Sequence, residues 1–386
     1  MKYIMKTLFF IPIFTLQFIS CYTPNHNYEI ISNFQDYEII NQDEIRLEKI
    51  DLTKTFDNPW AIEILDSDDL LVSEKYGKIT FVNHITKEHH LVSHDIPSHK
   101  VGQGGLLDLL LHENYLYVSF TKDNGYGDYT TAIGRGEFTS PYRKVNNFKI
   151  IFEAIPYLSD TKHFGSILVI NDDYLYASIG ERGQGIIAQE LDSHPGSIIR
   201  INLDGSDVDN PKNVSTILPE LFMIGVRNPQ GMTISPNGRI FISNHGAKGG
   251  DFIGEVIGGE NYGWNKIGWG GTNYTGTKIG DGDSFSDEFM LPIISWVPSI
   301  APGDIIFYSG DEFLGWDQNL LVTSLKYKLL VKLEMHQGNI VNKQIIFKDK
   351  IGRLRDIEVN SSGEIYLITD EKKSSIWRLT SAQNNR

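Results

Sequence analysis

The chain has 386 residues, of which 40% are hydrophobic and 22% charged, a composition typical of a globular protein that can bury a large core. Its 49 acidic residues outnumber its 35 basic ones and leave a formal net charge of -14. This balance argues against a nucleic-acid partner, because phosphate binding needs a basic surface. A single cysteine excludes an intrachain disulfide.

The first segment of the chain is typical of an export signal. Lys2 and Lys6 flank the start of an apolar run from Leu8 to Phe18, which is too short to span a membrane comfortably. A small residue and then Cys21 follow this run directly, as in a bacterial lipoprotein cleavage site. We therefore expect residues 1–21 to be a signal peptide and Cys21 to carry a lipid anchor, which gives stable membrane attachment. Such a protein would be periplasmic or on the cell surface. An ordinary signal peptide with an incidental cysteine is the alternative.

The next segment, residues 22–44, is polar and rich in Asn and Tyr, and we expect it to be a tether between membrane and domain. No internal linker divides the remainder, so residues 45–386 are expected to form one domain.

Within this domain one pattern recurs about six times. A polar turn is followed by a short run of aromatic, aliphatic and β-branched residues, which is a strand signal. The runs are Leu70–Ser73, Tyr115–Ser119, Tyr174–Ser178, Arg239–Ser243, Leu320–Thr323 and Ile365–Thr369. Blade-sized repeats with unequal spacing predict an all-β fold, a β-propeller with its insertions gathered on one face. A β-sandwich is the alternative, but it would not need six copies of one unit.

The longest insertion-like stretch runs from Gly246 to Phe289 and is rich in Gly, Asn and Asp. Long loops on a rigid scaffold are where function concentrates, so we expect this stretch to border the working face.

Four basic residues are candidates for binding a ligand, because a fold of strands and loops does not itself need their charges. Arg353 and Arg355 lie two positions apart, so in an extended segment they face the same way and offer two guanidinium forks to one carboxylate ligand. Arg227 lies in the segment Gly225-Val-Arg-Asn-Pro-Gln-Gly231, and Lys326 follows a predicted strand. Taken singly, each residue could equally be a surface or ion-paired side chain.

Histidines supply the candidate proton acceptor. His163 lies just before a predicted strand, and its ordinary pKa near neutrality suits a general base. His245 has a similar setting, and a solvated loop histidine is the alternative for both. The sequence contains no GxSxG elbow, HExxH pair, P-loop or zinc-type His/Cys spacing.

Taken together and in order, these segments resemble the PQQ-dependent soluble aldose sugar dehydrogenases, the glucose/sorbosone dehydrogenase family. The resemblance covers nearly all of the chain after about Leu52. Its motifs are Asn58-Pro-Trp-Ala-Ile62, Leu71-Val-Ser-Glu-Lys-Tyr-Gly-Lys-Ile79, Gly102-Gln-Gly-Gly-Leu-Leu-Asp108, His163-Phe-Gly-Ser166, Arg227-Asn-Pro-Gln-Gly-Met232, His245-Gly-Ala-Lys-Gly-Gly-Asp251, Asn261-Tyr-Gly-Trp264, Ser299-Ile-Ala-Pro302, Ser324-Leu-Lys326 and Arg353-Leu-Arg-Asp356.

The resemblance implies a six-bladed propeller with PQQ at one end of its channel. It implies an aldose substrate, oxidised at the C1 hydroxyl to a lactone, and a separate electron acceptor. His163 matches the family's base, and Arg227 is the second residue that the resemblance implies in catalysis. A Ca²⁺ beside the cofactor would be held by the backbone carbonyls of Gly246 and Ala247. The residues matching the family's cofactor contacts are Gln103, Arg227, Asn228, Ser299, Lys326, Arg353 and Arg355.

Two departures from the family pattern concern calcium. Ala247 stands where the family usually has Pro, although any residue supplies a carbonyl. Phe252 stands where relatives have a Glu that binds a second, structural Ca²⁺, and a phenyl ring cannot replace that ligand. The altered loops keep open an alternative, a non-enzymatic ligand- or partner-binding propeller lipoprotein, because the fold alone does not determine chemistry. A hydrolytic or isomerising propeller would need a carboxylate cluster near His163.

Overall fold

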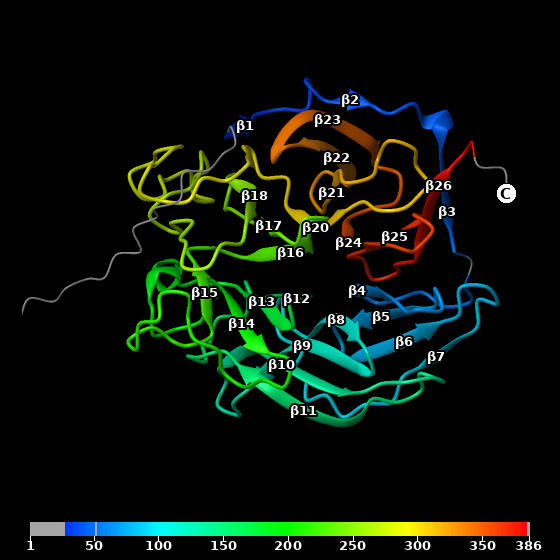
Figure 1. The fold of residues 1–386 in the computed structure, drawn as a ribbon, viewed down its shortest axis with the longest axis horizontal. Helices are drawn as coiled ribbons and strands as arrows, with labels where there is room; N and C mark the ends of the chain where they lie inside the picture. Colours follow the sequence, from blue (N-terminus) through cyan, green and yellow to red (C-terminus); the bar gives the residue numbers. More distant parts are fainter. Residues whose placement is uncertain (1–27, 51, 384–386) are drawn as a thin grey trace, which may run out of the picture.

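The structure, a computed structural model, describes residues 28–50 and 52–383. The predicted signal peptide and Cys21 lie outside these residues. Six β-sheets are arranged around a central channel, and Figure 1 looks down that channel. None of the helices in the described part of the chain is long and apolar enough to cross a membrane.

Each sheet is one blade of the propeller. Blade 1 contains β4 (Pro59–Ile64), β5 (Leu70–Glu74), β6 (Lys78–Val82) and β7 (His89–Leu91). Blade 2 contains β8 (Leu106–His112), β9 (Tyr115–Asp123), β10 (Tyr129–Glu137) and β11 (Asn146–Glu153). Blade 3 contains β12 (Gly165–Asn171), β13 (Tyr174–Ile179), β14 (Ser197–Asn202) and β15 (Leu221–Ile224).

The second half of the ring repeats this design. Blade 4 contains β16 (Pro229–Ile234), β17 (Ile240–Asn244), β18 (Asp251–Glu255) and β19 (Ile294–Trp296). Blade 5 contains β20 (Pro302–Phe307), β21 (Leu320–Ser324), β22 (Leu329–His336) and β23 (Asn339–Lys348). Blade 6 contains β24 (Leu354–Val359), β25 (Ile365–Thr369), β26 (Trp377–Ser381) and β3 (Ile45–Lys49). Two short 3-10 helices, η1 (Gln42–Glu44) and η2 (Gly185–Gln189), complete the described elements.

The six predicted turn-and-strand repeats correspond to the second strand of each blade, which confirms the propeller prediction. Four of these strands, β5, β17, β21 and β25, are buried along their whole length, because neighbouring blades cover both of their faces. A strand covered on both sides carries a nearly continuous apolar run rather than a strict alternation. The predicted insertion from Gly246 to Phe289 is not wholly loop, since it contains β18.

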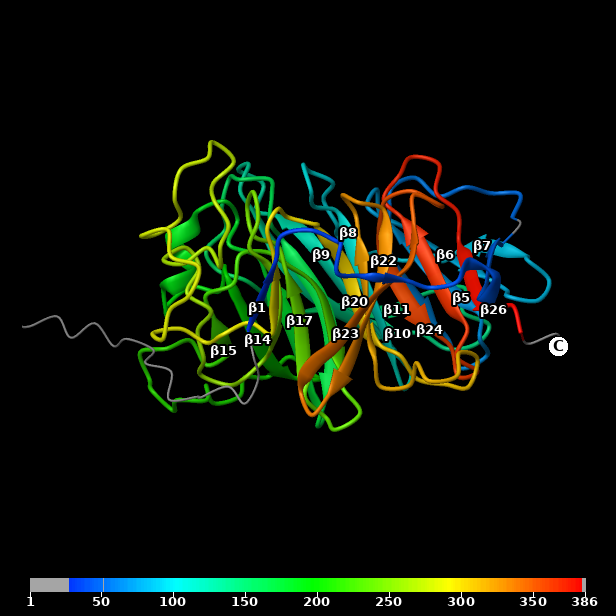
Figure 2. The same cartoon turned by 90° about the horizontal axis from the view of Figure 1, so that it is seen from above.

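The described part of the predicted tether is not a free linker. β1 (Glu29–Ile31) pairs in parallel with β19, and β2 (Glu38–Ile39) pairs in parallel with β23. The segment then enters β3, which closes blade 6 against β26. Residues 28–44 therefore form a belt along the rim of blades 4, 5 and 6, where it covers two sheet edges that would otherwise be open to pairing (Figures 1 and 2).

Aromatic residues fasten this belt to the propeller. The Tyr37 side chain is buried, and its hydroxyl accepts a hydrogen bond from Trp296 Nε1 at 3.0 Å. Phe34 packs edge-on against Tyr37 and Tyr327. Ile31, Phe34 and Tyr37, which lie three positions apart in a polar-looking segment, therefore explain why it is bound rather than free.

Candidate active site

The candidate site lies at one end of the channel. The innermost strand of each blade starts at this end, and the second strand, which runs antiparallel to it, finishes there. The loops that precede inner strands and the loops that follow second strands therefore lie together at this end of the channel. The predicted residues that precede inner strands are Gln103, His163, Arg227, Asn228, Ser299 and Arg353. Those that follow second strands are Gly246, Ala247 and Lys326, and Arg355 lies within β24.

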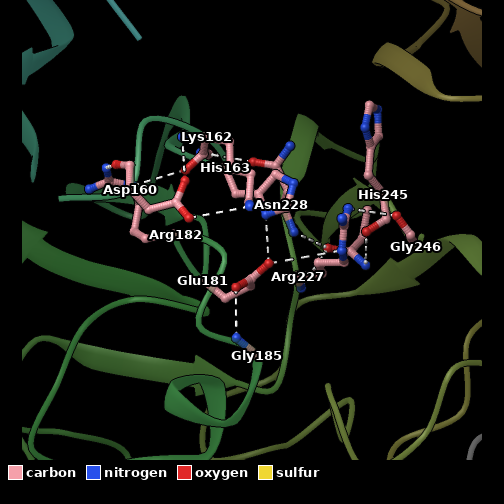
Figure 3. Close-up of polar contacts among 12 residues, drawn as sticks. Asp160, Lys162, His163, Glu181, Arg182, Gly185, Arg227, Asn228, His245 and Gly246 are labelled. Carbon is pink, nitrogen blue, oxygen red and sulfur yellow. Dashed lines mark hydrogen bonds and ion pairs between the residues drawn. The ribbon is translucent and has the colours of Figure 1, made fainter. Parts of the chain in front are cut away.

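His163 is paired with a buried carboxylate, that of Glu181. The His163 Nδ1–H donates to Glu181 Oε1 at 2.6 Å, so Nε2 is left to accept a proton (Figure 3). Burial lowers the pKa of His163, and nearby Arg227 lowers it further, while Glu181 opposes this shift. Burial alone would raise the pKa of Glu181, but the hydrogen bond from His163 holds it below its usual value. The pair therefore consists of a neutral imidazole and a carboxylate at neutral pH.

The backbone around His163 is held in an uncommon conformation. His163 has φ +54°, in the left-handed region that non-glycine residues seldom occupy. Its backbone N–H donates to Gln103 Oε1 at 2.8 Å. A Cβ on Gly180 would lie 2.1 Å from the His163 carbonyl oxygen, so only glycine fits there. These contacts fix the backbone at His163, and the hydrogen bond to Glu181 orients the imidazole.

Arg182 holds the loop that carries His163. Its guanidinium lies 3.7 Å from the centre of the Phe164 ring and donates to the carbonyl oxygens of Lys162 and Asp160. Burial lowers the pKa of Arg182 to about 10, which still leaves it positively charged at neutral pH.

Arg227 links the histidine pair to the predicted calcium loop. Its Nε lies 3.9 Å from Glu181 Oε1, and its Nη1 donates to the Gly246 carbonyl at 2.6 Å. The Asn244 side-chain oxygen accepts the backbone N–H groups of both Arg227 and Asn228 at 3.0 Å. The Arg227 segment is therefore an ordered turn, buried beside the site.

A cavity next to His163 is lined mostly by polar and aromatic side chains. They are Trp60, Lys75, Gln103, Phe164, Asn228, Gln230, His245, Ala301, Leu325, Arg353, Arg355 and Asp370. Asn228 Oδ1 accepts from the backbone N–H of Gly165, and Gln230 Oε1 accepts from Arg355 Nη1 at 3.0 Å. His245 Nε2 lies 2.5 Å from the Pro302 carbonyl, and burial lowers its pKa to about 3, so this histidine is neutral.

One wall of the cavity carries an excess of positive charge. Arg353 and Arg355 each lie 3.6 Å from Asp370 Oδ2, and Lys75 Nζ lies 3.0 Å from Asp370 Oδ1. Arg355 and Lys75 also lie over the Trp60 ring, at 4.3 and 5.2 Å from its centre. Burial alone would raise the pKa of Asp370, but Arg355 and Lys75 hold it well below its usual range. Three cations thus share one carboxylate.

An unsatisfied group adds to this excess of positive charge. Arg355 Nε is buried and has no hydrogen-bond acceptor among the described residues. A buried N–H donor without an acceptor destabilises the folded state, unless a bound molecule supplies the acceptor. The wall therefore fits an anionic ligand that would accept from Arg355, as the spacing of the two arginines predicted.

Lys326 and Ser299 lie together at the rim of this site. Lys326 is exposed, and its Nζ donates to the Ser299 carbonyl oxygen at 2.9 Å. The Ser299 hydroxyl donates to Asp251 Oδ2 at 2.6 Å rather than into the cavity. Asp251 also accepts from the Gly246 N–H at 2.8 Å, so it ties the Ser299 loop to the predicted calcium loop.

Three residues at the site were missed by the sequence reasoning, namely Lys75, Glu181 and Asp370. A usable signal was present, because each stands within three residues of the end of a predicted repeat strand. His245 and Lys326 occupy the same kind of position. Charged residues just past the second strand of a blade were therefore the pattern to search for.

The comparisons with known proteins identify the family. The model described as Glucose / Sorbosone dehydrogenase matches residues 56–378. The chain belongs to the glucose/sorbosone dehydrogenase family.

Individual relatives agree with this family. The aldose sugar dehydrogenase YliI of Escherichia coli (strain K12) is 30% identical over 346 residues, which cover 85% of this chain and 91% of the relative. A crystal structure of a glucose dehydrogenase superposes with a TM-score of 0.82 and 29% identity, covering 86% of this chain and 99% of its own. The PQQ-bound aldose sugar dehydrogenase of Streptomyces coelicolor has a TM-score of 0.71 and 22% identity, over 88% of this chain and 99% of its own, and shows the fold.

Phe252, which stands where the resemblance places a ligand of a second calcium, offers no side-chain oxygen ligand in the structure. Phe252 is buried, and its ring centre lies 4.6 Å from that of Tyr262. The Tyr262 hydroxyl donates to the Glu255 carbonyl at 2.9 Å, and its own carbonyl accepts from Trp269 Nε1. An aromatic cluster without free oxygen ligands occupies this place. Across residues 28–50 and 52–383, no group of three His, Cys, Asp or Glu side chains could hold a metal ion.

Proposed function

We propose that this protein oxidises an aldose sugar at its C1 hydroxyl to the lactone, with PQQ as cofactor and His163 as general base. The observation that carries the proposal is the hydrogen bond between a neutral His163 and an ionised Glu181, beside a cavity one wall of which has three cations for one carboxylate. A base and an anion cradle together suit a sugar dehydrogenase better than either would alone.

The cavity residues fit a tricarboxylate quinone. Arg355, Arg353 and Lys75 would hold carboxylate or quinone oxygens, with the free Nε of Arg355 as one donor. Gln103 and Asn228 line the same cavity, and Lys326 with Ser299 would close its rim. When bound, PQQ supplies the quinone that accepts a hydride. A structural neighbour described as PQQ-bound supports this choice of cofactor.

His163 performs the proton transfer. Its Nε2 takes the proton of the C1 hydroxyl, the C1–H electron pair leaves as a hydride, and a C=O bond forms at C1. The imidazole then carries a positive charge, and Glu181 at 2.6 Å stabilises it in a low-dielectric setting. Burial alone would raise the pKa of Glu181, but the hydrogen bond from His163 and, to a smaller extent, nearby Arg227 hold it below its usual value.

The proposed Ca²⁺ would be bound by the backbone carbonyls of Gly246 and Ala247. Carbonyl oxygens suit this hard cation. The Gly246 oxygen accepts from the Arg227 guanidinium at 2.6 Å, so a bound Ca²⁺ would have to share this carbonyl with Arg227 or displace it. The remaining ligands would come from the cofactor and water.

Reconstitution tests the proposal directly. Purified protein would be titrated with PQQ in Ca²⁺ buffer, with binding followed by absorbance, and dye reduction assayed on a panel of aldoses. We expect binding and turnover with at least one aldose, and His163→Ala should bind PQQ while losing turnover. No PQQ binding and no activity would overturn the proposal. Saturable binding without turnover on any sugar would support the non-enzymatic alternative.

The proposal extends to export and lipid anchoring through Cys21, supported by the position of the chain's single cysteine directly after an apolar run. Metabolic labelling with an alkyne fatty acid should tag the wild-type chain and leave Cys21→Ala unlabelled. Equal labelling of both, or labelling of neither, would contradict the anchor.

A further inference from the structure

Two exposed apolar side chains, those of Ile186 and Tyr274, stand on loops that border the proposed base. Ile186 belongs to η2 and is 55% exposed. Tyr274 lies in a hairpin within the long stretch that follows Gly246 and is 71% exposed. Exposed apolar residues scattered singly over a surface are ordinary. These two are not scattered, because their loops pack on each other beside Arg227.

The bases of the two loops are joined in a small buried cluster. Ala188 of η2 and Ile279 at the base of the hairpin pack together with Ala247 and Trp264. Trp264 in turn lies against Arg227, with the guanidinium carbon 5.4 Å from the centre of the indole ring. The two exposed side chains therefore rise from neighbouring loops at the Arg227 side of the site.

The hairpin that carries Tyr274 is ordered. Thr272 and Lys278 pair across it as an antiparallel bridge. The Thr272 carbonyl oxygen accepts from the backbone N–H of Lys248 at 2.9 Å, which ties the hairpin to the predicted calcium loop. The tyrosine ring is thus presented at a defined position, so that a ligand binding to it would lose little free energy in ordering the loop.

Tyr274 also lies close to the proposed base. The Arg227 guanidinium carbon lies over one face of the ring, 5.9 Å from its centre, and Arg227 Nε lies 3.9 Å from Glu181 Oε1, the partner of His163. On the other loop, the backbone N–H of Gly185 donates to Glu181 Oε2 at 2.8 Å (Figure 3). The second face of the ring is therefore open to solvent, with only Arg227 and Glu181 between the ring and His163.

We propose that Tyr274 is a platform for the second unit of an oligosaccharide whose reducing-end unit has its C1 at His163. The inference rests on the proposed aldose oxidation and adds a substrate class, oligosaccharides with a free reducing end. Tyr274 is exposed whereas Arg227 beneath it is buried, so the ring stands where a sugar chain would leave the site.

The chemistry of the platform suits a sugar ring. A pyranose has a face of C–H groups, whose partly positive hydrogens are attracted to the negative face of an aromatic ring. Ile186 would contact the apolar edge of the same sugar unit. Because the platform is open to water, the hydroxyl groups of that unit stay hydrated, and the cost of burying them without partners is avoided.

Kinetics with matched sugars test the platform. The full chain with PQQ and Ca²⁺ would be assayed on glucose and on maltose, cellobiose and lactose, which all carry glucose at the reducing end. If the aldose panel identifies another sugar, disaccharides that end in that sugar replace these. The quantity compared is kcat/KM for each disaccharide divided by kcat/KM for the monosaccharide.

We expect Tyr274→Ala to lower this ratio by about 10-fold for at least one disaccharide, mainly through a higher KM, because stacking holds ground state and transition state alike. Tyr274→Phe keeps the ring and should keep the wild-type ratio. Tyr126→Ala is the control, since Tyr126 is 92% exposed in the β9–β10 hairpin at the same end of the propeller. It should also keep the ratio.

Three kinetic outcomes would overturn the platform. They are a wild-type ratio in Tyr274→Ala for every disaccharide, an equal fall in Tyr126→Ala, and a fall in Tyr274→Phe as large as that in Tyr274→Ala. Because Arg227 lies under the ring, a general disturbance of the base would slow the monosaccharide and the disaccharides together and leave the ratio unchanged.

Saturation-transfer difference NMR separates this inference from the proposed function. It records binding of each disaccharide to the full chain with PQQ and Ca²⁺ but without an electron acceptor. We expect the non-reducing unit to receive saturation from wild type and Tyr274→Phe, and less from Tyr274→Ala. If this difference is seen but no aldose is oxidised, the proposed oxidation fails and the platform stands as a sugar-binding site. Equal saturation from wild type and Tyr274→Ala, or none from either, would overturn the platform even if aldoses are oxidised.

Discussion

Glu181 accepts the Nδ1–H of His163 at 2.6 Å, and both side chains are buried where blade 3 meets the candidate cofactor cavity. This contact assigns two functions to one carboxylate. It orients the imidazole, and in the proposed reaction it would stabilise the positive charge that the imidazole acquires. The proposed chemistry depends on this pair more than on any other contact.

Removing the Glu181 charge should slow turnover and shift its pH dependence. Glu181→Gln keeps an acceptor for Nδ1–H but loses the charge that raises the pKa of His163. The acid limb of kcat/KM, which reports protonation of His163, should therefore move to lower pH while kcat falls. His163→Ala should lose about 10²- to 10⁴-fold, the usual contribution of a general base. Glu190→Gln, on an exposed residue, is the matched control. A limb that moves to higher pH would contradict the assignment.

Asp370→Asn should destabilise the protein without cofactor. It leaves Lys75, Arg353 and Arg355 without their carboxylate, and breaking a buried pair costs about 3–5 kcal/mol. The stabilisation is present above the pKa of Asp370 in the unfolded chain and is lost as pH falls through its depressed folded pKa. The difference in the free energy of unfolding between wild type and Asp370→Asn should therefore persist at pH 5. PQQ should raise the melting temperature of the variant more than that of wild type, and an equal shift would argue against an anionic ligand on this wall.

Phe252 should behave as a core residue, not as part of a metal site. Phe252→Ala should lower the free energy of unfolding by about 3–5 kcal/mol, because the ring is buried against Tyr262. Urea titrations of wild type and variant, with and without Ca²⁺, would measure this. We expect the difference between the two proteins to be the same in both buffers. Calcium-dependent rescue of the variant would show that an ion can still bind there.

The belt should contribute to stability without affecting the site. Tyr37→Phe removes the acceptor of the Trp296 Nε1–H and should cost about 1–3 kcal/mol, the penalty for an unsatisfied buried donor. Tyr126→Phe is the control, since that side chain is 92% exposed and should change stability by less than about 0.5 kcal/mol. Activity per folded molecule should be unchanged in both. A loss equal in the two variants would show that the belt contact is not stabilising.

The sequence by itself determined the repeating unit. Turn residues followed by apolar and β-branched runs are local signals, and all six of them fell on the second strand of a blade, for example β13 at Tyr174–Ile179 and β25 at Ile365–Thr369. The motif residues Arg353 and Arg355 were also readable from the sequence, and both reach Asp370, although Arg353 lies before β24 and the pairing of that strand shifts register between Leu354 and Asp356.

Only the tertiary structure decided which groups meet. Glu181 reaches His163 because the end of β13 lies beside the start of β12, and Asp370 reaches Lys75 because blade 6 closes against blade 1. The belt likewise depends on ring closure, which joins residues hundreds of positions apart, such as Tyr37 and Trp296. Local propensity is a property of neighbouring residues. Charge pairing, burial and the resulting pKa shifts depend on distances that exist only after the blades have closed into a ring.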